Sequence, residues 1–164
     1  MDRDKLIELL FEKAKAYNIE EVEVYINKDS SIDFNIYEGK LEKYVAAEEE
    51  NLSLRGIYKG KMGYSYTENI DESSIDMLID EAFENSKYID SLDKEIIFAG
   101  SDEYEEINNY NDSLEKTPME DKIAFMKNLE KEALAMDSRV SAIQVCAYQE
   151  FQRDRYIINT KGVN

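Results

Sequence analysis

The side chains that most often carry catalysis are scarce in this sequence. Its 164 residues contain no histidine and one cysteine, Cys146. Without histidine, no Ser-His-Asp or Cys-His arrangement can form within the chain. A zinc site would have to use one cysteine and carboxylates, which is an unusual ligand set for that metal. We therefore assign no catalytic, metal-binding or cofactor-binding residue to this chain.

The one thiol is expected to be structural. Cys146 lies in the apolar run VSAIQVCAY, and no neighbour there would lower its pKa, so the sequence predicts a buried, inert thiol. A single cysteine permits no disulfide within the chain, which suits a reducing cytoplasm. The acidic start MDRDKLIELL is unlike a signal peptide, and no run is apolar for long enough to cross a membrane.

Two side chains are candidates for binding a substrate. Arg55 lies in NLSLRGIY, within a stretch (51–67) that has three basic residues and no acidic one. It can form a salt bridge or snorkel at a strand edge, or it can contact a carboxylate of a bound peptide. Tyr64, in GYSYT, belongs either to a packed sheet face or to a binding surface, and sheet packing is the simpler expectation.

The chain is strongly acidic. Its formal net charge is −17, and residues 68–121 hold 18 acidic and three basic side chains. A protein that follows a nucleic-acid backbone needs a basic face, so direct binding of DNA or RNA is disfavoured. The acidity gives a solvated surface, or it makes the chain an interaction module for a basic partner. The sequence leaves the role of 68–121 open.

Three helices should position these residues. Leu6, Leu10, Ala14 and Tyr17 recur at helical spacing, with Asp2 or Asp4 able to cap the start. A second helix should run from a cap at Asp71 to about Tyr88, and residues 90–116 should form a long surface connection. In the third helix, Thr117, Pro118 and Glu120 have the pattern of a capping box. The apolar positions of that third helix are Ile123, Met126, Leu129 and Ala133.

Alternating patterns predict about seven strands. They lie near 22–27, 32–37, 41–47, 51–58, 61–67, 140–148 and 151–159. Glu38-Gly39 and Lys59-Gly60 are expected to be two-residue hairpin turns. The run 140–148 is apolar on both faces, which is typical of a central strand. The expected fold class is α+β, with a mainly antiparallel sheet and three helices packed on it, as a single domain over 1–164.

Three segments resemble the TldD/PmbA family. They are VEVYINKDSSIDFNIYEGKLEKYVAAEEENLSLRGIYKGKMGYSYT, TENIDESSIDMLIDEAFENSKYI and DSRVSAIQVCAYQEFQRDRYIINTKGVN. The last ends in the family's pattern of asparagine, small hydroxyl, any residue and glycine, here residues 159–162. Gly63-Tyr64-Ser65 and this closing turn carry most of the resemblance, which covers nearly the whole chain.

The resemblance implies a role in proteolysis. Family members were named as modulators of DNA gyrase and act in the cytoplasm as proteases, or as partners of proteases, on peptides and antitoxins. The family name implies, as the alternative, that DNA gyrase is the basic partner of an acidic interaction module. The zinc motif of the family lies in a C-terminal half that this chain does not resemble. The resemblance thus implies a non-catalytic N-terminal domain that contributes to a peptide-substrate chamber or a subunit interface. Expected partners are a peptide or unfolded protein substrate and a family member, as a homo- or hetero-oligomer, with no membrane.

The turn at Lys161-Gly162 resembles the two earlier hairpin turns, each of which begins a strand. The sequence therefore predicts that a strand, and the C-terminal metalloprotease-type domain, follow in a longer parent protein. The parent is then a zinc metallopeptidase or an inactive partner of one, and any zinc belongs to that other half.

Overall fold

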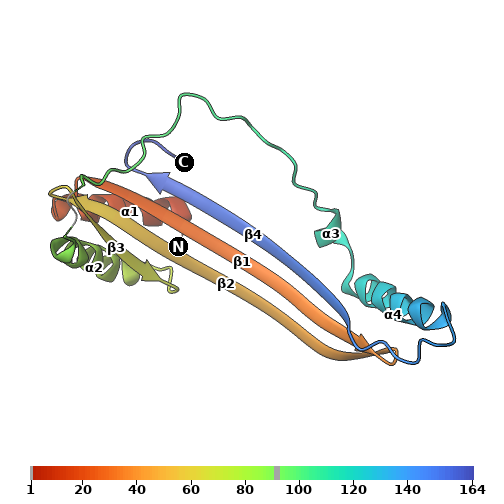
Figure 1. The fold of residues 1–164 in the computed structure, drawn as a ribbon. Helices are drawn as coiled ribbons and strands as arrows, with labels where there is room; N and C mark the ends of the chain where they lie inside the picture. The colour runs from red at the N-terminus through yellow and green to blue at the C-terminus, as the bar shows by residue number, and fades with distance from the viewer. Residues whose placement is uncertain (1, 91–92) are drawn as a thin grey trace. The chain divides into compact units, whose positions relative to one another are not determined.

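A computed structural model describes residues 2–90 and 93–164 and has an α+β fold (Figure 1). Within these residues there are four helices and four strands. In chain order they are α1 (Arg3–Ala16), β1 (Glu21–Tyr37), β2 (Lys40–Tyr58), β3 (Lys61–Thr67), α2 (Ser74–Tyr88), α3 (Ser113–Lys116), α4 (Met119–Ala135) and β4 (Cys146–Asn159). The fold class is as expected from the sequence.

The expected number of strands was wrong. The described residues form one antiparallel sheet of four strands, in the order β3-β2-β1-β4. The two segments expected at 22–27 and 32–37 are both part of β1, and those at 41–47 and 51–58 are both part of β2. The polar stretches between them, KDSS and AEEE, stay extended, because a polar run need not end a strand whose backbone remains paired.

The expected central strand at 140–148 was also wrong. Residues 140–145 are not in a strand, and Val145 is exposed. β4 begins at Cys146 and continues through the segment expected at 151–159. Because its one neighbour in the sheet is β1, β4 is an edge strand. Apolar residues on both faces therefore did not mark a central strand here.

The two hairpin turns are confirmed. β1 ends at Tyr37 and β2 begins at Lys40, while β2 ends at Tyr58 and β3 begins at Lys61. Both residues of each turn have positive φ, 50° and 73° at Glu38-Gly39 and 51° and 76° at Lys59-Gly60. These are the angles of a type I′ turn, which matches the twist of the flanking strands.

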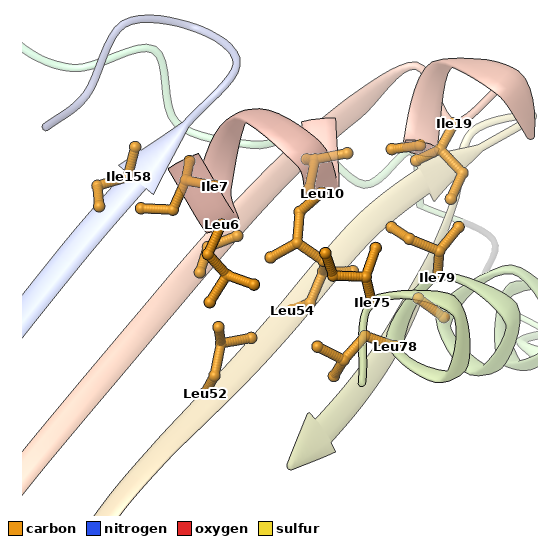
Figure 2. Packing of buried hydrophobic residues seen from close by; sticks show 14 of the residues in the cluster. Leu6, Ile7, Leu10, Ile19, Leu52, Leu54, Ile75, Leu78, Ile79 and Ile158 are labelled. Carbon is orange, nitrogen blue, oxygen red and sulfur yellow. The ribbon is translucent and has the colours of Figure 1, made fainter. Parts of the chain in front are cut away.

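The chain forms two compact units, which are described separately. The first unit comprises residues 1–29, 49–103 and 153–164, and the second comprises 30–48 and 104–152. In the first unit, α1 and α2 bury their apolar sides against one face of the sheet (Figure 2). Leu6 and Leu10 from α1 and Leu78 from α2 meet Leu52 and Leu54 from β2 in this core, as the helical spacing predicts.

Helix α2 lies directly on β3. A Cβ atom on Gly63 would be 1.6 Å from the carbonyl oxygen of Ala82, so no larger residue fits between strand and helix. Next to this contact, the Ser65 hydroxyl donates a hydrogen bond of 2.7 Å to the carbonyl of Leu78. The cap expected at Asp71 was wrong, because Ser73 is the N-cap residue of α2 and no side chain caps the helix. The Asp71 carboxylate instead accepts from the backbone N–H of Ser73 at 2.8 Å, ahead of the helix.

In the second unit, α4 packs on β1 and β4. Phe34, Ile36, Met126 and Cys146 form the buried cluster, and the ring of Phe34 stacks on that of Tyr148. The capping box expected at Thr117 is absent: Pro118 is the N-cap residue, and Thr117 Oγ1 donates instead to the carbonyl of Ser113. The backbone turn of α3 competes for the threonine hydroxyl.

The orientation of α4 also differs from the expectation. Leu129 was placed on the buried side, but it is exposed, whereas Lys122 and Glu130 are buried. Lys122 Nζ lies 2.6 Å from Glu150 Oε2. The two carboxylate oxygens of Glu130 accept the backbone N–H groups of Glu38 and Gly39 at 3.0 and 2.7 Å. These polar contacts set the face that α4 turns inward.

The long connection expected at 90–116 is largely present. Residues 93–112 are in neither helix nor strand, and the short helix α3 follows. Residues 91 and 92 lie outside the described part of the chain.

Candidate functional site

The two candidate substrate-binding residues are opposite each other in the sheet. In the antiparallel register of β2 and β3, Arg55 pairs with Tyr64. Leu52 and Leu54 point into the core. Because successive side chains of a strand point to opposite faces of the sheet, Arg55 lies on the face away from the helices. The Tyr64 hydroxyl donates to Ser53 Oγ at 2.9 Å, and its ring is half-exposed.

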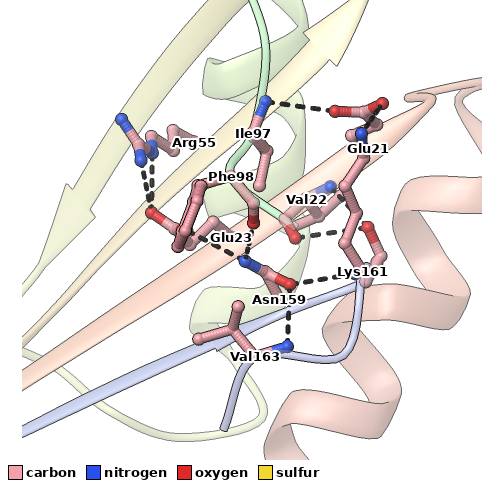
Figure 3. A network of polar contacts seen from close by, with 10 residues as sticks. Glu21, Val22, Glu23, Arg55, Ile97, Phe98, Asn159, Lys161 and Val163 are labelled. Atoms are coloured by element: carbon pink, nitrogen blue, oxygen red, sulfur yellow. Dashed lines mark hydrogen bonds and ion pairs between the residues drawn. The ribbon is translucent and has the colours of Figure 1, made fainter. Parts of the chain in front are cut away.

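Arg55 forms an ion pair with Glu23 of β1. Its Nε and Nη2 lie 2.8 and 2.6 Å from the same carboxylate oxygen, Oε1 (Figure 3). The Glu23 carboxylate is buried, while the Arg55 side chain is 43% exposed. The salt bridge considered for Arg55 is therefore present. A guanidinium has five N–H donors, so part of this group remains able to meet an acidic group from outside.

Asn159 of β4 completes the arrangement. Its Nδ2 donates to the second oxygen of Glu23 at 3.1 Å and to the carbonyl of Phe98 at 2.9 Å. Its Oδ1 accepts from the backbone N–H groups of Lys161 and Val163. Tyr64, Arg55, Glu23 and Asn159 thus supply one side chain from each of β3, β2, β1 and β4, and we refer to these four as the polar row.

A segment of the 93–103 connection crosses the end of the polar row. Figure 3 shows Ile97 and Phe98 beside Glu23 and Asn159. The backbone N–H of Ile97 donates to Glu21 Oε2 at 3.1 Å, and Ile97 itself is buried. Lys161 Nζ lies 2.7 Å from the other oxygen of Glu21. The hydrogen bond from Lys161, together with that from Ile97, holds the pKa of Glu21 below its usual value.

Residues 159–162, which form the closing pattern, have a structural role. The backbone N–H of Thr160 donates to the carbonyl of Val22 at 2.9 Å, and the N–H of Val22 donates to Thr160 Oγ1 at 3.1 Å. Gly162 adopts φ of +100°, which L side chains rarely tolerate. Asparagine, hydroxyl and glycine therefore join the end of β4 to the start of β1.

Sequence reasoning missed Glu23 and the side-chain role of Asn159. Glu23 alternates with the core residues Val22 and Val24, and this phase places it on the same face as Arg55. The signal was thus present in the pattern, but the ion pair depends on the register of β1 against β2. The sequence gives that register only through the hairpin turn between them.

The polar row is a network of internal hydrogen bonds and one ion pair, and it holds no nucleophile paired with a base. Its carboxylate is occupied by Arg55 and Asn159, and its exposed groups are a guanidinium and a phenol. In residues 2–90 and 93–164, no group of three His, Cys, Asp or Glu side chains is arranged to hold a metal ion. What the row offers chemically is hydrogen bonding and charge.

Cys146 is buried, as predicted. Its Sγ donates to the carbonyl of Met126 at 3.6 Å, and burial raises the pKa of the thiol. A raised pKa keeps the sulfur protonated at neutral pH and therefore poorly nucleophilic. The helices of the described residues include none that is long and apolar enough to cross a membrane.

Comparisons with known proteins agree on one family. Residues 22–86 match the model of PmbA/TldA metallopeptidase domain 1, and residues 112–164 match that of the PmbA/TldA metallopeptidase central domain. No curated protein sequence matches the chain.

Three solved structures have a similar fold. A proposed modulator of a DNA gyrase from Thermotoga maritima is 25% identical, with a TM-score of 0.85 over 99% of this chain and 36% of its own. TldE from Thermococcus kodakarensis is 16% identical, with a TM-score of 0.75 over 96% of this chain and 35% of its own. A proposed modulator of DNA gyrase from Bacteroides thetaiotaomicron is 18% identical, with a TM-score of 0.77 over 97% and 37%.

The present chain thus spans little more than a third of each solved relative. The match to domain 1 precedes the match to the central domain along the chain, and the two matched ranges together contain all four residues of the polar row. The chain belongs to the PmbA/TldD metallopeptidase family.

Proposed function

We propose that this chain is the non-catalytic N-terminal domain of a longer PmbA/TldD-like metallopeptidase, or of an inactive partner of one. In this role it helps to hold a peptide substrate or to form a subunit interface in a cytoplasmic assembly. The observation that supports substrate holding best is an open sheet edge. β3 pairs with β2 only from Leu52 to Tyr58, so residues 40–48 have β1 on one side and no strand of the described chain on the other.

This open edge suits an extended peptide. Nearly all side chains of residues 40–48 are exposed, among them Leu41, Tyr44 and Val45. A two-residue turn makes Tyr37 and Lys40 a hydrogen-bonded pair, so even-numbered residues near the turn bond to β1. The odd-numbered residues 41, 43 and 45 then direct their backbone N–H and C=O groups outward, where an added strand can bind them.

The catalytic chemistry would come from elsewhere in the parent. We propose that zinc, where the parent binds it, is held by the C-terminal half. Arg55 and Tyr64 of the polar row stay candidates for contacting an acidic group of the substrate.

The test of the open edge uses one position and two substitutions. Lys43→Pro removes an outward N–H without removing a bond to β1, whereas Lys43→Thr keeps that N–H and is the matched control. Binding of an unfolded, fluorescently labelled peptide should weaken about tenfold in Lys43→Pro and stay unchanged in Lys43→Thr. Equal binding by both variants would contradict strand addition at this edge.

A second candidate is an acidic interaction module for a basic partner. The charge of −17 and the 18 acidic residues in 68–121 favour it, and the names of two solved relatives mention DNA gyrase. It predicts a complex with gyrase that weakens as salt is raised, because screening reduces the attraction between opposite charges. No complex at low salt would remove this candidate.

A further inference from the structure

A short segment of the long connection lies across the end of the polar row. We refer to its residues 95–99 as the strap. Ile97 is 1% exposed, whereas its neighbours Ile96 and Phe98 are 68% and 57% exposed. Ile97 belongs to neither of the two core clusters of the described residues. Its side chain is therefore buried at a separate place, beside the polar row (Figure 3).

Side chains of the sheet hold the backbone of the strap. Glu21 Oε2 accepts from the backbone N–H of Ile97 at 3.1 Å. Asn159 Nδ2 donates to the carbonyl of Phe98 at 2.9 Å. A carboxylate and a primary amide can bind these two groups in almost any sequence, because every residue except proline carries a backbone N–H and a C=O. The buried side chain of Ile97 is thus the contact that depends on residue type.

The two side chains that bind the strap are fixed by contacts outside it. Lys161 Nζ lies 2.7 Å from the other oxygen of Glu21. Asn159 Oδ1 accepts from the backbone N–H groups of Lys161 and Val163 at 2.9 and 3.2 Å. Asn159 Nδ2 also donates to Glu23 at 3.1 Å. These contacts remain when the strap leaves, so the place that it occupies is preorganised for another peptide segment.

The strap is attached in a way that allows it to leave. Within residues 93–111 of the described chain, Ile97 is the one buried residue, and no residue is in a helix or strand. A segment with one buried side chain and no ladder of backbone hydrogen bonds opens locally at a smaller free-energy cost than the sheet beneath it. Opening of the strap therefore does not require unfolding of the first unit.

We propose that the strap is an internal ligand that occupies a peptide-binding site, where a second peptide with an aliphatic residue can replace it. The incoming peptide donates a backbone N–H to Glu21, accepts a hydrogen bond from Asn159 at a C=O, and buries its aliphatic side chain where Ile97 lies. The proposal rests on the proposed function, that this chain holds a peptide. It adds a second site, in the first unit, to the open edge at 40–48 of the second.

The strap competes with any added peptide because it is tethered to the site. A segment linked through a short flexible chain has an effective concentration on the order of 1 mM. An added peptide at a much lower concentration should therefore bind the original chain weakly. It should bind more tightly when the strap itself is weakened, because a larger fraction of the chain then has the site open.

The experiment measures binding of a fluorescently labelled peptide, DKEIIFAGS, which copies residues 93–101. In fluorescence anisotropy, Ile97→Ser in the chain should tighten binding of this peptide by at least about tenfold. Ile96→Ser changes the neighbouring, exposed isoleucine and is the matched control. This control should bind the peptide as weakly as the original chain does.

The same pair of substitutions in the peptide tests which side chain the site binds. On the Ile97→Ser chain, a peptide that carries Ile97→Ser should bind at least about tenfold more weakly than the unchanged peptide, because it has no aliphatic side chain to bury. A peptide that carries Ile96→Ser should bind as tightly as the unchanged one. Circular dichroism verifies that each chain variant is folded.

Hydrogen exchange of the original chain tests the opening without any substitution. The amide of Ile97 should exchange through local opening while the amides of β1 stay protected. Exchange of Ile97 only together with β1 would overturn the proposal, as would an Ile97→Ser chain that binds the peptide no better than the original. Equal binding of the two substituted peptides would also overturn it. Lys43→Pro should leave binding of this peptide unchanged, so failure at the strap is distinguishable from failure at the open edge.

Discussion

The two compact units are held together by different kinds of interior. Among the described residues, the core cluster of the first unit contains 15 buried hydrophobic side chains, and that of the second contains four. The second unit adds Lys122 and Glu130, which are buried and bonded to Glu150 and to the Glu38-Gly39 turn. Apolar packing thus forms most of the interior of the first unit, beside the buried Glu23 and Asn159 of the polar row, whereas polar contacts make up a larger share of the smaller interior of the second unit.

The difference predicts that removing one partner of the Lys122–Glu150 pair has the largest effect. Lys122→Ala leaves Glu150 largely buried without its cation, at a cost of about 3–5 kcal/mol in the free energy of unfolding. The double variant Lys122→Met/Glu150→Leu should recover most of that loss, because an apolar pair of similar size leaves no charge unpaired. Urea unfolding followed by circular dichroism measures both. A double variant as unstable as Lys122→Ala would show that the pair is not a unit.

In the first unit, close packing should be the sensitive feature. Gly63→Ala places a methyl group where the Ala82 carbonyl already lies, and we expect a loss of about 3 kcal/mol. Gly39→Ala is the control, since its Cβ would meet no atom within 4 Å and only the positive φ opposes it. That strain costs about 1 kcal/mol. Equal losses at the two positions would contradict the contact of α2 with β3.

Helix α4 allows a direct comparison of its two sides. Met126→Ala removes a buried side chain and should cost about 2 kcal/mol, whereas Leu129→Ala should change the free energy of unfolding by less than about 0.5 kcal/mol. Thermal unfolding of the two variants and of the original chain measures the two values. A larger loss for Leu129→Ala would restore the helix orientation expected from the sequence.

The smallest expected effect concerns pH. Burial works to raise the pKa of Glu150, but hydrogen bonds from Lys122 and Tyr148 outweigh it and keep the pKa lowered. The stabilisation is therefore complete above the ordinary value of 4.5 and is lost as pH falls through the lower folded value. Burial and the bond to Glu150 also raise the pKa of Tyr148 to about 12, so its hydroxyl stays a donor throughout.

Glu150→Gln tests this pH dependence. Urea unfolding between pH 6 and pH 3 should show a shallower loss of stability in the variant than in the original chain. An unchanged slope would mean that Glu150 is not among the groups that titrate on unfolding in acid.

The sequence was informative where local rules decide the outcome. The positive φ needed at Gly39 and Gly60 fixed both hairpins, and the apolar stripes of α1 and α2 fixed the core of the first unit. Prediction from the sequence failed where a polar contact between residues far apart in the chain determines the structure. Leu129 looked buried because nothing local reveals that Lys122 and Glu130 point inward. Residues 22–27 and 32–37 were expected to be separate strands, although β1 continues through the polar residues between them.

The candidate site was predictable in part. Arg55 and Tyr64 stood out by composition, and the structure brings them into register on one face. Glu23 and Asn159, which are 136 residues apart in the chain, join them from β1 and β4, a pairing that sheet order alone determines. A pattern read along the chain gives the face on which a strand residue lies, but not its neighbour across strands.

The central claim is that this chain holds an extended peptide and does not cut it. The most direct measurement is hydrogen exchange by mass spectrometry on the chain mixed with zinc and an unfolded peptide, with the peptide mass followed in the same samples. The account predicts slowed exchange in residues 40–48 and a peptide that remains intact. Cleavage of the peptide, or tight binding of one zinc ion per chain without protection at 40–48, would contradict it.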